Sequence, residues 1–187
     1  MLYLIYEIFF MKENVYLIGG RAVGKSSIGT KLAASLGYKF LDTDTLITDA
    51  CGFSVAEIVE RAGWQVFRAY EKRALLQLIP QKSCVVATGG GAILHRELWK
   101  ELKKLGTVVW LMADPSILCE RIEADCHSAA QRPSLTGKNI CQELEDVLEE
   151  RNPLYRKTAD CIIDSGKLTI DEAVQKIIQI CIEIDRE

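Results

Sequence analysis

A surplus of positive charge is missing from this chain of 187 residues, in which 23 Lys and Arg stand against 26 Asp and Glu for a net charge of −3. General binders of nucleic acids or anionic membranes need such a surplus, so we expect neither kind of partner. Proline is scarce, at four residues, and neither low-complexity tracts nor internal repeats occur. The composition predicts a single globular domain, which we expect to be a monomer.

No C-x-x-C pair is present among the seven cysteines, which are Cys51, Cys84, Cys119, Cys126, Cys141, Cys161 and Cys181. Their odd number and their spacing fit neither a zinc ribbon nor a disulfide framework. We therefore expect buried thiols and a cytoplasmic location, where the reducing environment keeps cysteines unpaired. Cys126 and His127 could form half of a metal site, but no second pair of ligands accompanies them.

A membrane-spanning run is missing as well. The apolar segment MLYLIYEIFF at residues 1–10 is too short to span a bilayer, and it lacks the positive end and cleavage site of a signal peptide. Met11 is the first residue of the next segment, MKENVYLIGG, and a domain that begins there would open with a β-strand. We expect residues 1–10 to be dispensable and residues 11–187 to form the domain. The alternative for residues 1–10 is an added edge strand.

Short apolar runs alternate with helical patterns along the rest of the chain. The apolar runs are continuous, as in parallel strands covered on both faces, and lie at 15–18, 39–41, 84–87, 108–112 and 161–163. The helical patterns lie at 27–36, 54–79, 97–105, 115–123, 140–156 and 170–184. This alternation predicts an α/β protein with three layers, αβα, around a parallel sheet.

Local signals mark several ends of these helices. Ser54 and Glu57 have the spacing of a capping box. Gly37, Gly63 and Gly106 each follow a helical pattern and are expected to close it as C′ residues, a position that favours a left-handed backbone. Residues 124–139 break the order, because they are polar and show little periodicity. A segment of that length is typical of a mobile lid rather than of a simple connection.

A phosphate-binding loop follows the first predicted strand. Gly19-x-x-x-x-Gly24-Lys25-Ser26 matches the P-loop pattern in full, with a strand before it and a helix after it. In such a loop the backbone N–H groups and the helix N-terminus, which includes Ser27, surround the phosphates. Lys25 is expected to reach the β- and γ-phosphates and Ser26 to bind Mg²⁺. The alternative, a glycine turn with a solvated lysine, explains a lone glycine pair but not the complete pattern.

Ala22 and Val23 depart from the common form of this loop. Many P-loops have a glycine and a small residue at these two positions, because glycine adopts a positive φ without strain. The loop is therefore either compatible with these side chains or slightly strained. We expect an altered nucleotide affinity at most.

Two carboxylates follow the second predicted strand, in Leu41-Asp42-Thr43-Asp44. The carboxyl edge of a parallel sheet is where such folds bind ligands, so both should lie beside the P-loop. One carboxylate can join the magnesium shell, and the other can accept hydrogen bonds from substrate hydroxyls. The alternative is an N-cap pair for the next helix, and both roles can coexist.

Two further segments suggest an acceptor site. Arg68 and Glu71 are three residues apart and share a helix face, for which a surface ion pair of little energy is the alternative interpretation. Gly89, Gly90 and Gly91 follow the third predicted strand. Three glycines there cost conformational entropy, which is explained if another group packs closely against the backbone. A flexible turn is the alternative.

The ordered set of motifs resembles the shikimate kinase family. GxxxxGKS, DTD, FRxxE, GGG, RPSL and RNPLY occur in this order and at the family's spacing, from residue 12 to the C-terminus. The resemblance implies a nucleoside-monophosphate-kinase-like fold with a five-stranded parallel sheet. It also implies transfer of the γ-phosphate of ATP, with Mg²⁺, to the 3-hydroxyl of shikimate on the route to chorismate.

The family's residue roles fall on matching positions of this sequence. Asp42 corresponds to the carboxylate near the magnesium ion, and Asp44 to the one that binds shikimate hydroxyls and serves as the candidate base. The resemblance implies catalytic roles for Lys25, Asp44 and Arg132, of which Arg132 is the lid arginine. It implies that the nucleotide is bound by Gly19, Ala22, Val23, Gly24, Lys25, Ser26, Ser27, Arg132 and Arg121, the last of these over the adenine.

The acceptor side is implied in the same way. Arg68 and Arg151 correspond to the two arginines that bind the shikimate carboxylate, a task suited to planar guanidinium groups. Backbone N–H groups of Gly89, Gly90 and Gly91 should face the substrate. Two other functions stay open. One is a gluconate-type kinase, which also phosphorylates a carboxylated polyol, and the other is a non-catalytic nucleotide-binding module.

Overall fold

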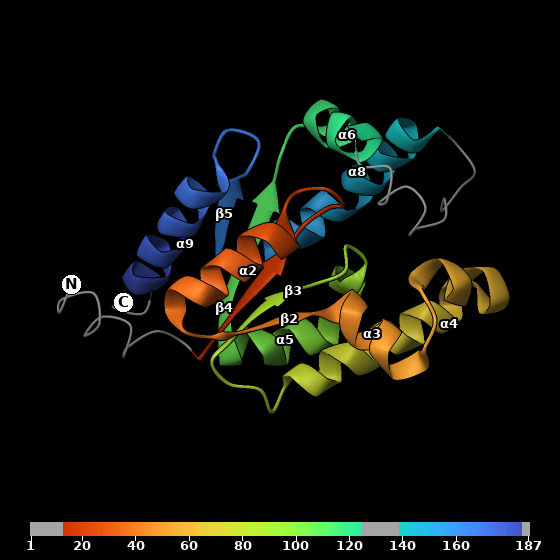
Figure 1. The fold of residues 1–187 in the computed structure, drawn as a ribbon, viewed down its shortest axis with the longest axis horizontal. Coiled ribbons are helices and arrows are strands. Elements are labelled where there is room, and N and C mark those ends of the chain that lie inside the picture. The colour runs from red at the N-terminus through yellow and green to blue at the C-terminus, as the bar shows by residue number, and fades with distance from the viewer. Residues whose placement is uncertain (1–12, 125–138, 185–187) are drawn as a thin grey trace.

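The computed structural model describes residues 13–124 and 139–184, which form a five-stranded, wholly parallel sheet with helices on both faces (Figure 1). The strand order is β2-β3-β1-β4-β5. The strands are β1 (Asn14–Ile18), β2 (Lys39–Asp42), β3 (Cys84–Ala87), β4 (Gly106–Met112) and β5 (Cys161–Asp164). The five predicted strands and their parallel pairing are confirmed.

The helices follow the strands in alternation. They are α2 (Lys25–Leu36), α3 (Thr43–Cys51), α4 (Val55–Leu78), the short 3₁₀ helix η1 (Ala92–Leu94), α5 (Arg96–Leu105), α6 (Pro115–Ala124), α8 (Ile140–Thr158) and α9 (Ile170–Ile184). The sequence prediction missed α3 and η1. Helix α3 begins directly after β2, where the Asp42 carboxylate accepts a hydrogen bond from the backbone N of Asp44 at 2.9 Å and caps the helix.

Alternate residues of the strands enter two separate cores, which makes the fold three layers deep. Val15 and Leu17 of β1 face the core formed with α2, α6, α8 and α9. Tyr16 and Ile18 face the opposite core, which contains residues of α4 and α5. Figure 1 shows α2 and α9 on one side of the sheet and α5 on the other. The predicted αβα class is therefore confirmed.

The predicted helix ends have mixed outcomes. The capping box of Ser54 and Glu57 is present, and Gly37 closes α2 in the left-handed conformation. Gly63 lies at a kink with φ 79° and ψ 169°, so it interrupts α4 without being a left-handed cap. The prediction for Gly106 is wrong, because its backbone is extended, at φ −174°, and it begins β4. A Cβ there would lie 2.5 Å from the carbonyl oxygen of Asn14, so close strand packing explains this glycine.

The expectation of unpaired cysteines is wrong at one place. Cys119 of α6 and Cys141 of α8 form a disulfide across 22 positions of sequence. Spacing along the chain could not indicate this pair, because packing of α6 against α8 brings the two residues together. Cys84 and Cys181 are buried and lie outside this disulfide, as expected.

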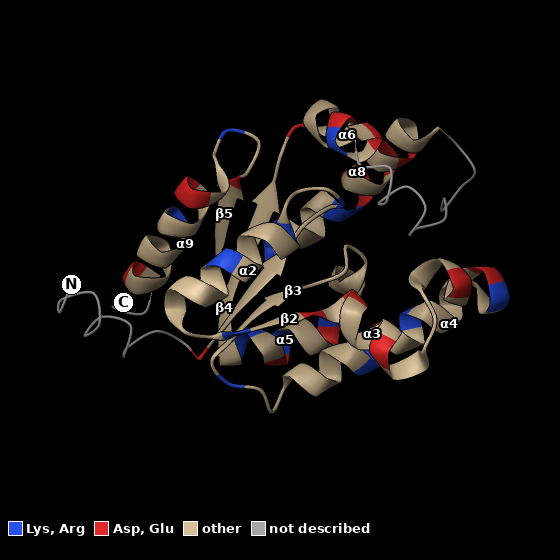
Figure 2. Cartoon of the chain, viewed as in Figure 1, with Lys and Arg blue, Asp and Glu red and all other residues tan. Residues whose placement is uncertain are grey.

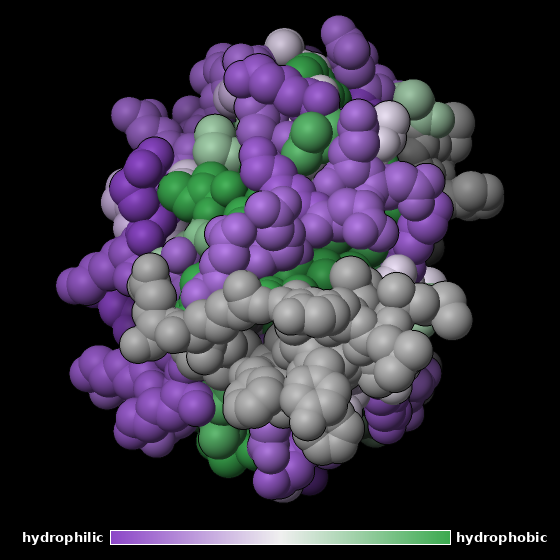
Figure 3. Space-filling view, turned by 90° about the vertical axis from the view of Figure 1, so that its left-hand side faces the viewer, coloured by the Kyte–Doolittle hydropathy of each residue, from purple (hydrophilic) through white to green (hydrophobic). Residues whose placement is uncertain are grey.

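The surface agrees with the composition. Positive and negative residues are interspersed along the helices in Figure 2. Hydrophilic residues predominate among the described residues visible on the face in Figure 3, with small hydrophobic areas between them. None of the helices in the described ranges combines the length and the apolarity that crossing a bilayer requires.

Candidate active site

The P-loop lies between the end of β1 and the start of α2. Gly19 and Gly24 have φ values of 139° and 92°, which glycine adopts readily, and they turn the chain from strand into helix. Lys25 Nζ donates hydrogen bonds to the carbonyl oxygens of Gly19, at 3.0 Å, and Gly20, at 2.5 Å. The ammonium group is therefore held over the loop, where it can meet the phosphates of a nucleotide.

Ala22 is the strained residue of this loop. Its φ of 61° is left-handed, a conformation that costs a residue with a Cβ roughly 1–2 kcal/mol. Of the two alternatives for the loop, slight strain is the one observed.

Replacing Ala22 with glycine is expected to stabilise the fold by about 0.5–1 kcal/mol, because glycine removes the steric cost of the positive φ. Urea unfolding of the two proteins measures the difference. Ser35→Gly is the matched control, since Ser35 is exposed inside α2 and glycine there should destabilise by a similar amount. An Ala22→Gly protein that is less stable than the parent would contradict the strain.

Ser26 and Asp42 form a pair of oxygen donors beside the loop. Ser26 Oγ donates a hydrogen bond of 2.7 Å to Asp42 Oδ2, while Asp42 Oδ1 caps α3. The carboxylate therefore acts as an N-cap and still presents its second oxygen to the phosphate side. A hydroxyl and a carboxylate in contact are a donor set that suits Mg²⁺.

Two cavities meet at the carboxyl edge of the sheet, and Asp44 lines both. The second cavity is formed mainly by the P-loop, α2 and α3, with Lys25, Ser26, Ser27, Asp42 and Arg121 among its lining residues. The first cavity lies beyond Asp44 and contains Arg68, Gly89, Gly90, Gly91 and Arg151. A group bound in one cavity can thus approach a group bound in the other next to the Asp44 carboxylate.

Arg151 brings a buried positive charge to the first cavity. It lies on α8 and is 8% exposed, and its Nε has no hydrogen-bond partner among the described residues. Burying a guanidinium group without a complete set of partners is costly, so the arrangement favours an anionic ligand that supplies them.

Arg68 reaches the same cavity from α4. Its Nη1 contacts Glu71 Oε2 at 2.8 Å, and His95 Nε2 lies 3.1 Å from the same oxygen. Glu71 is 0% exposed, so the alternative of a surface ion pair is wrong. The buried carboxylate instead fixes the guanidinium group of Arg68 at the cavity wall.

The three glycines after β3 are packed closely by functional side chains. A Cβ on Gly89 would lie 2.7 Å from Asp44 Oδ1, and one on Gly91 would overlap the guanidinium group of Arg68. The Gly90 carbonyl accepts a hydrogen bond of 2.5 Å from the Tyr155 hydroxyl. The interpretation of close packing is therefore correct, and a flexible turn is not.

A protein-family model described as shikimate kinase matches residues 21–182, which is most of the chain. The chain belongs to the shikimate kinase family. It is 42% identical over 170 residues to shikimate kinase 2 of Yersinia enterocolitica, an alignment that covers 91% of this chain and 96% of the relative. Shikimate kinase 2 of Salmonella schwarzengrund is 44% identical over 168 residues, with coverage of 90% and 91%.

Solved structures give the same relationship. The shikimate kinase from Acinetobacter baumannii, in complex with shikimate, superposes with a TM-score of 0.87 at 34% identity, covering 96% of this chain and 98% of that one. A gluconokinase from Sinorhizobium meliloti superposes with a TM-score of 0.56 at 17% identity, covering 94% and 95%. That second likeness concerns the fold alone. This shikimate kinase family member is an ATP-dependent kinase.

Arg121 of this kinase lines the second cavity. Its guanidinium group donates hydrogen bonds to the carbonyl oxygens of Ala22, at 3.4 Å, and Ser165, at 3.1 Å. The side chain thus bridges the P-loop and the segment after β5. Arg132 and most of the predicted lid, 124–139, lie outside the described residues.

The structure adds site residues that motif reading did not single out in this kinase. Arg21 lines both cavities beside Asp44. Thr43 Oγ1 accepts a hydrogen bond of 2.8 Å from the backbone N of Gly89 and so ties the glycine segment to α3. Tyr155 is the last residue of the RNPLY motif, to which the sequence prediction assigns no role, and it is 1% exposed. A buried tyrosine needs a partner for its hydroxyl, which is the signal that could have indicated it.

Proposed function

We propose that the protein transfers the γ-phosphate of ATP to the 3-hydroxyl of shikimate, giving shikimate 3-phosphate and ADP. The single observation that carries this proposal is the position of Asp44 between the two cavities. One cavity presents Lys25 of the P-loop, and the other presents the buried guanidinium group of Arg151. The solved relative from Acinetobacter baumannii, which holds shikimate, supports the choice of acceptor.

On the donor side, the loop backbone and Lys25 orient the phosphates and neutralise their charge. Ser26 and Asp42 are the residues that would hold Mg²⁺, which would add positive charge beside the transferring phosphate. Arg121 would lie against the adenine, and Arg132 of the proposed lid at 124–139 would stabilise the charge of the transferred group. Such transfer depends on positioning and electrostatics more than on covalent chemistry.

On the acceptor side, Arg68 and Arg151 bind the carboxylate of shikimate with forked donors. Gly90 and Gly91 bring the backbone close to the ring. Asp44 orients the 3-hydroxyl and accepts its proton as the hydroxyl oxygen attacks the γ-phosphorus. The bridging oxygen leaves with ADP.

We further propose that the protein is a cytoplasmic monomer. The absence of a spanning helix from the described residues is compatible with that location. Residues 1–10 are proposed to be dispensable, so a protein that begins at Met11 should turn over at the same rate.

A coupled assay of ADP release, with ATP and Mg²⁺ and with shikimate or gluconate as acceptor, tests the function. We expect rapid ADP release with shikimate, little with gluconate and little without an acceptor. ADP release with gluconate but not with shikimate would identify gluconate as the substrate. Nucleotide binding without transfer to either acid would identify a non-catalytic module.

Replacing Arg151 with alanine is expected to raise the KM for shikimate by roughly 30- to 1,000-fold, because a charge-assisted pair with the carboxylate contributes about 2–4 kcal/mol. The value of kcat should fall much less, since the carboxylate lies away from the reacting hydroxyl. Steady-state kinetics at varied shikimate separates the two constants. Lys157→Ala, an exposed position on the same helix, is the control. An unchanged KM in Arg151→Ala would remove this arginine from the site.

A further inference from the structure

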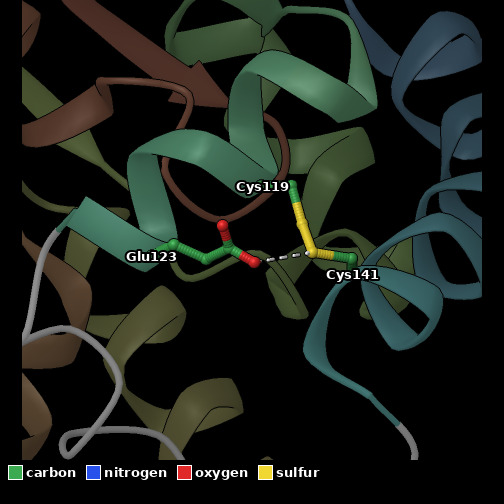
Figure 4. Close-up of side chains that lie close together, drawn as sticks. All are labelled: Cys119, Glu123 and Cys141. Atoms are coloured by element: carbon green, nitrogen blue, oxygen red, sulfur yellow. Dashed lines mark hydrogen bonds between the residues drawn. A yellow bond between two sulfur atoms is a disulfide. The ribbon is translucent and has the colours of Figure 1, made fainter.

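A covalent bond joins the two helices that stand on either side of residues 125–138. Cys119 lies on α6 and Cys141 in the first turn of α8, and Figure 4 shows their sulfur atoms bonded between the two ribbons. The Cα atoms are 5.5 Å apart, within the usual range for disulfides. The bond therefore fits the packing of the two helices.

A thiol reagent can reach both cysteines of the pair from solvent. Cys119 and Cys141 are partly exposed, whereas Cys84 and Cys181 are buried. Cys161 is partly exposed, but burial of its sulfur raises the pKa of its thiol to about 11. Exchange requires a thiolate, so Cys161 is a poor competitor near neutral pH. Cys51 is partly exposed and has no cysteine partner among the described residues.

The two helices carry site residues on either side of the bond. Arg121 is two positions after Cys119 and contacts the P-loop carbonyl of Ala22. Ile122 of α6 and Leu144 of α8 line the same cavity as Arg151. A bond between α6 and α8 therefore restricts the movement of the helix that carries Arg121 relative to the helix that carries Arg151.

We propose that Cys119 and Cys141 are a redox-modification site, in which reversible disulfide formation by a small-molecule disulfide controls how freely α6 moves against α8. In the first step one cysteine thiolate attacks a disulfide RSSR, forming a mixed disulfide and releasing RS⁻. In the second step the other cysteine thiolate attacks the protein sulfur of the mixed disulfide and releases a second RS⁻. The two cysteines are oxidised, RSSR is reduced to two RSH, and two protons pass from the cysteines to the released thiolates.

The functional consequence concerns the nucleotide. Arg121, which is carried by α6, lines the second cavity and bridges the carbonyl oxygens of Ala22 and Ser165. Because α6 carries Arg121, a disulfide that restricts α6 is expected to slow nucleotide exchange, whereas the dithiol permits it. In a reducing compartment the dithiol is the resting form, and oxidation lowers the rate. This consequence rests on the proposed kinase function, whereas the modification itself does not.

The test treats the whole protein with glutathione disulfide or with dithiothreitol. Peptide mapping should identify a Cys119–Cys141 link in the oxidised protein, which loses two hydrogens. The oxidised form should unfold at a temperature higher by roughly 5–10 °C, because the bond restricts the unfolded chain. Its kcat should be lower by roughly two- to ten-fold and should recover with dithiothreitol.

Matched variants isolate the bond. Cys119→Ser with Cys141→Ser should abolish all three effects, whereas Cys161→Ser and Cys51→Ser should keep them. The proposal is overturned by a link from Cys126 to either cysteine, or by a link that leaves kcat unchanged. The ligand atoms of Cys119, Cys141 and Glu123 lie within 4.8 Å of one another. The proposal is therefore also overturned if the reduced pair binds Zn²⁺ together with Glu123 and resists oxidation. If no form transfers phosphate to shikimate, the kinase proposal fails, while the mapping and unfolding results still decide the modification.

Discussion

Asp44→Asn is expected to lower kcat by roughly 10²- to 10⁴-fold, because an amide keeps the shape of the carboxylate but cannot accept the proton of the attacking hydroxyl. Asp44 lines both cavities, so no other described carboxylate has the same access to donor and acceptor together. The KM for shikimate should change much less, because Arg68 and Arg151 remain to bind the acid. Steady-state rates at saturating ATP and shikimate give the comparison.

The control for this substitution is Glu60→Gln, which removes an exposed carboxylate from the neighbouring helix α4. It should leave kcat and both KM values unchanged. Circular dichroism and thermal unfolding should show both variants folded. An Asp44→Asn protein with the kcat of the parent would mean that the hydroxyl loses its proton without help from this residue.

Lys25→Ala should reduce turnover by roughly 10²- to 10³-fold or more, because the ammonium group neutralises charge that develops on the transferred phosphate. In the structure this group contacts the Gly19 and Gly20 carbonyls, so it already lies where the phosphates would bind. Affinity for ATP, measured by titration calorimetry, should fall as well. Lys31→Ala is the matched control.

Lys31 lies on the same helix α2 but is half-exposed and pairs with Asp171 of α9. Its loss should change stability by about 1 kcal/mol or less and leave turnover intact. Equal loss of activity in both variants would indicate a general dependence on positive charge near α2. That result would contradict a specific contact between Lys25 and the phosphates.

The parts of the site that are local in sequence could be predicted from the sequence. The P-loop is encoded by its own residues, since Gly19 and Gly24 adopt positive φ and Lys25 follows at a fixed spacing. Asp42 was expected to be either a cap or a magnesium ligand, and its two oxygens separately contact the α3 backbone and Ser26. Continuous apolar runs likewise predicted the five strands, because parallel strands are covered on both faces.

Features that depend on contacts across the fold could not be predicted. The spacing of Arg68 and Glu71 is equally typical of an exposed pair, and only the packing of α4 near His95 shows that Glu71 is buried. Cys119 and Cys141 meet because α6 packs against α8, which the spacing of the cysteines along the chain does not indicate. Gly106 resembled a helix end, but its lack of a side chain serves the close approach of β1.

The most direct test of the account is a crystal structure with shikimate, Mg²⁺ and a non-hydrolysable ATP analogue. We predict that the shikimate carboxylate contacts the guanidinium groups of both Arg68 and Arg151 at about 3 Å. The 3-hydroxyl should then lie between Asp44 and the terminal phosphate, in line for transfer. A bound acid whose carboxylate contacts neither arginine, or whose hydroxyl faces away from Asp44, would contradict the central claim.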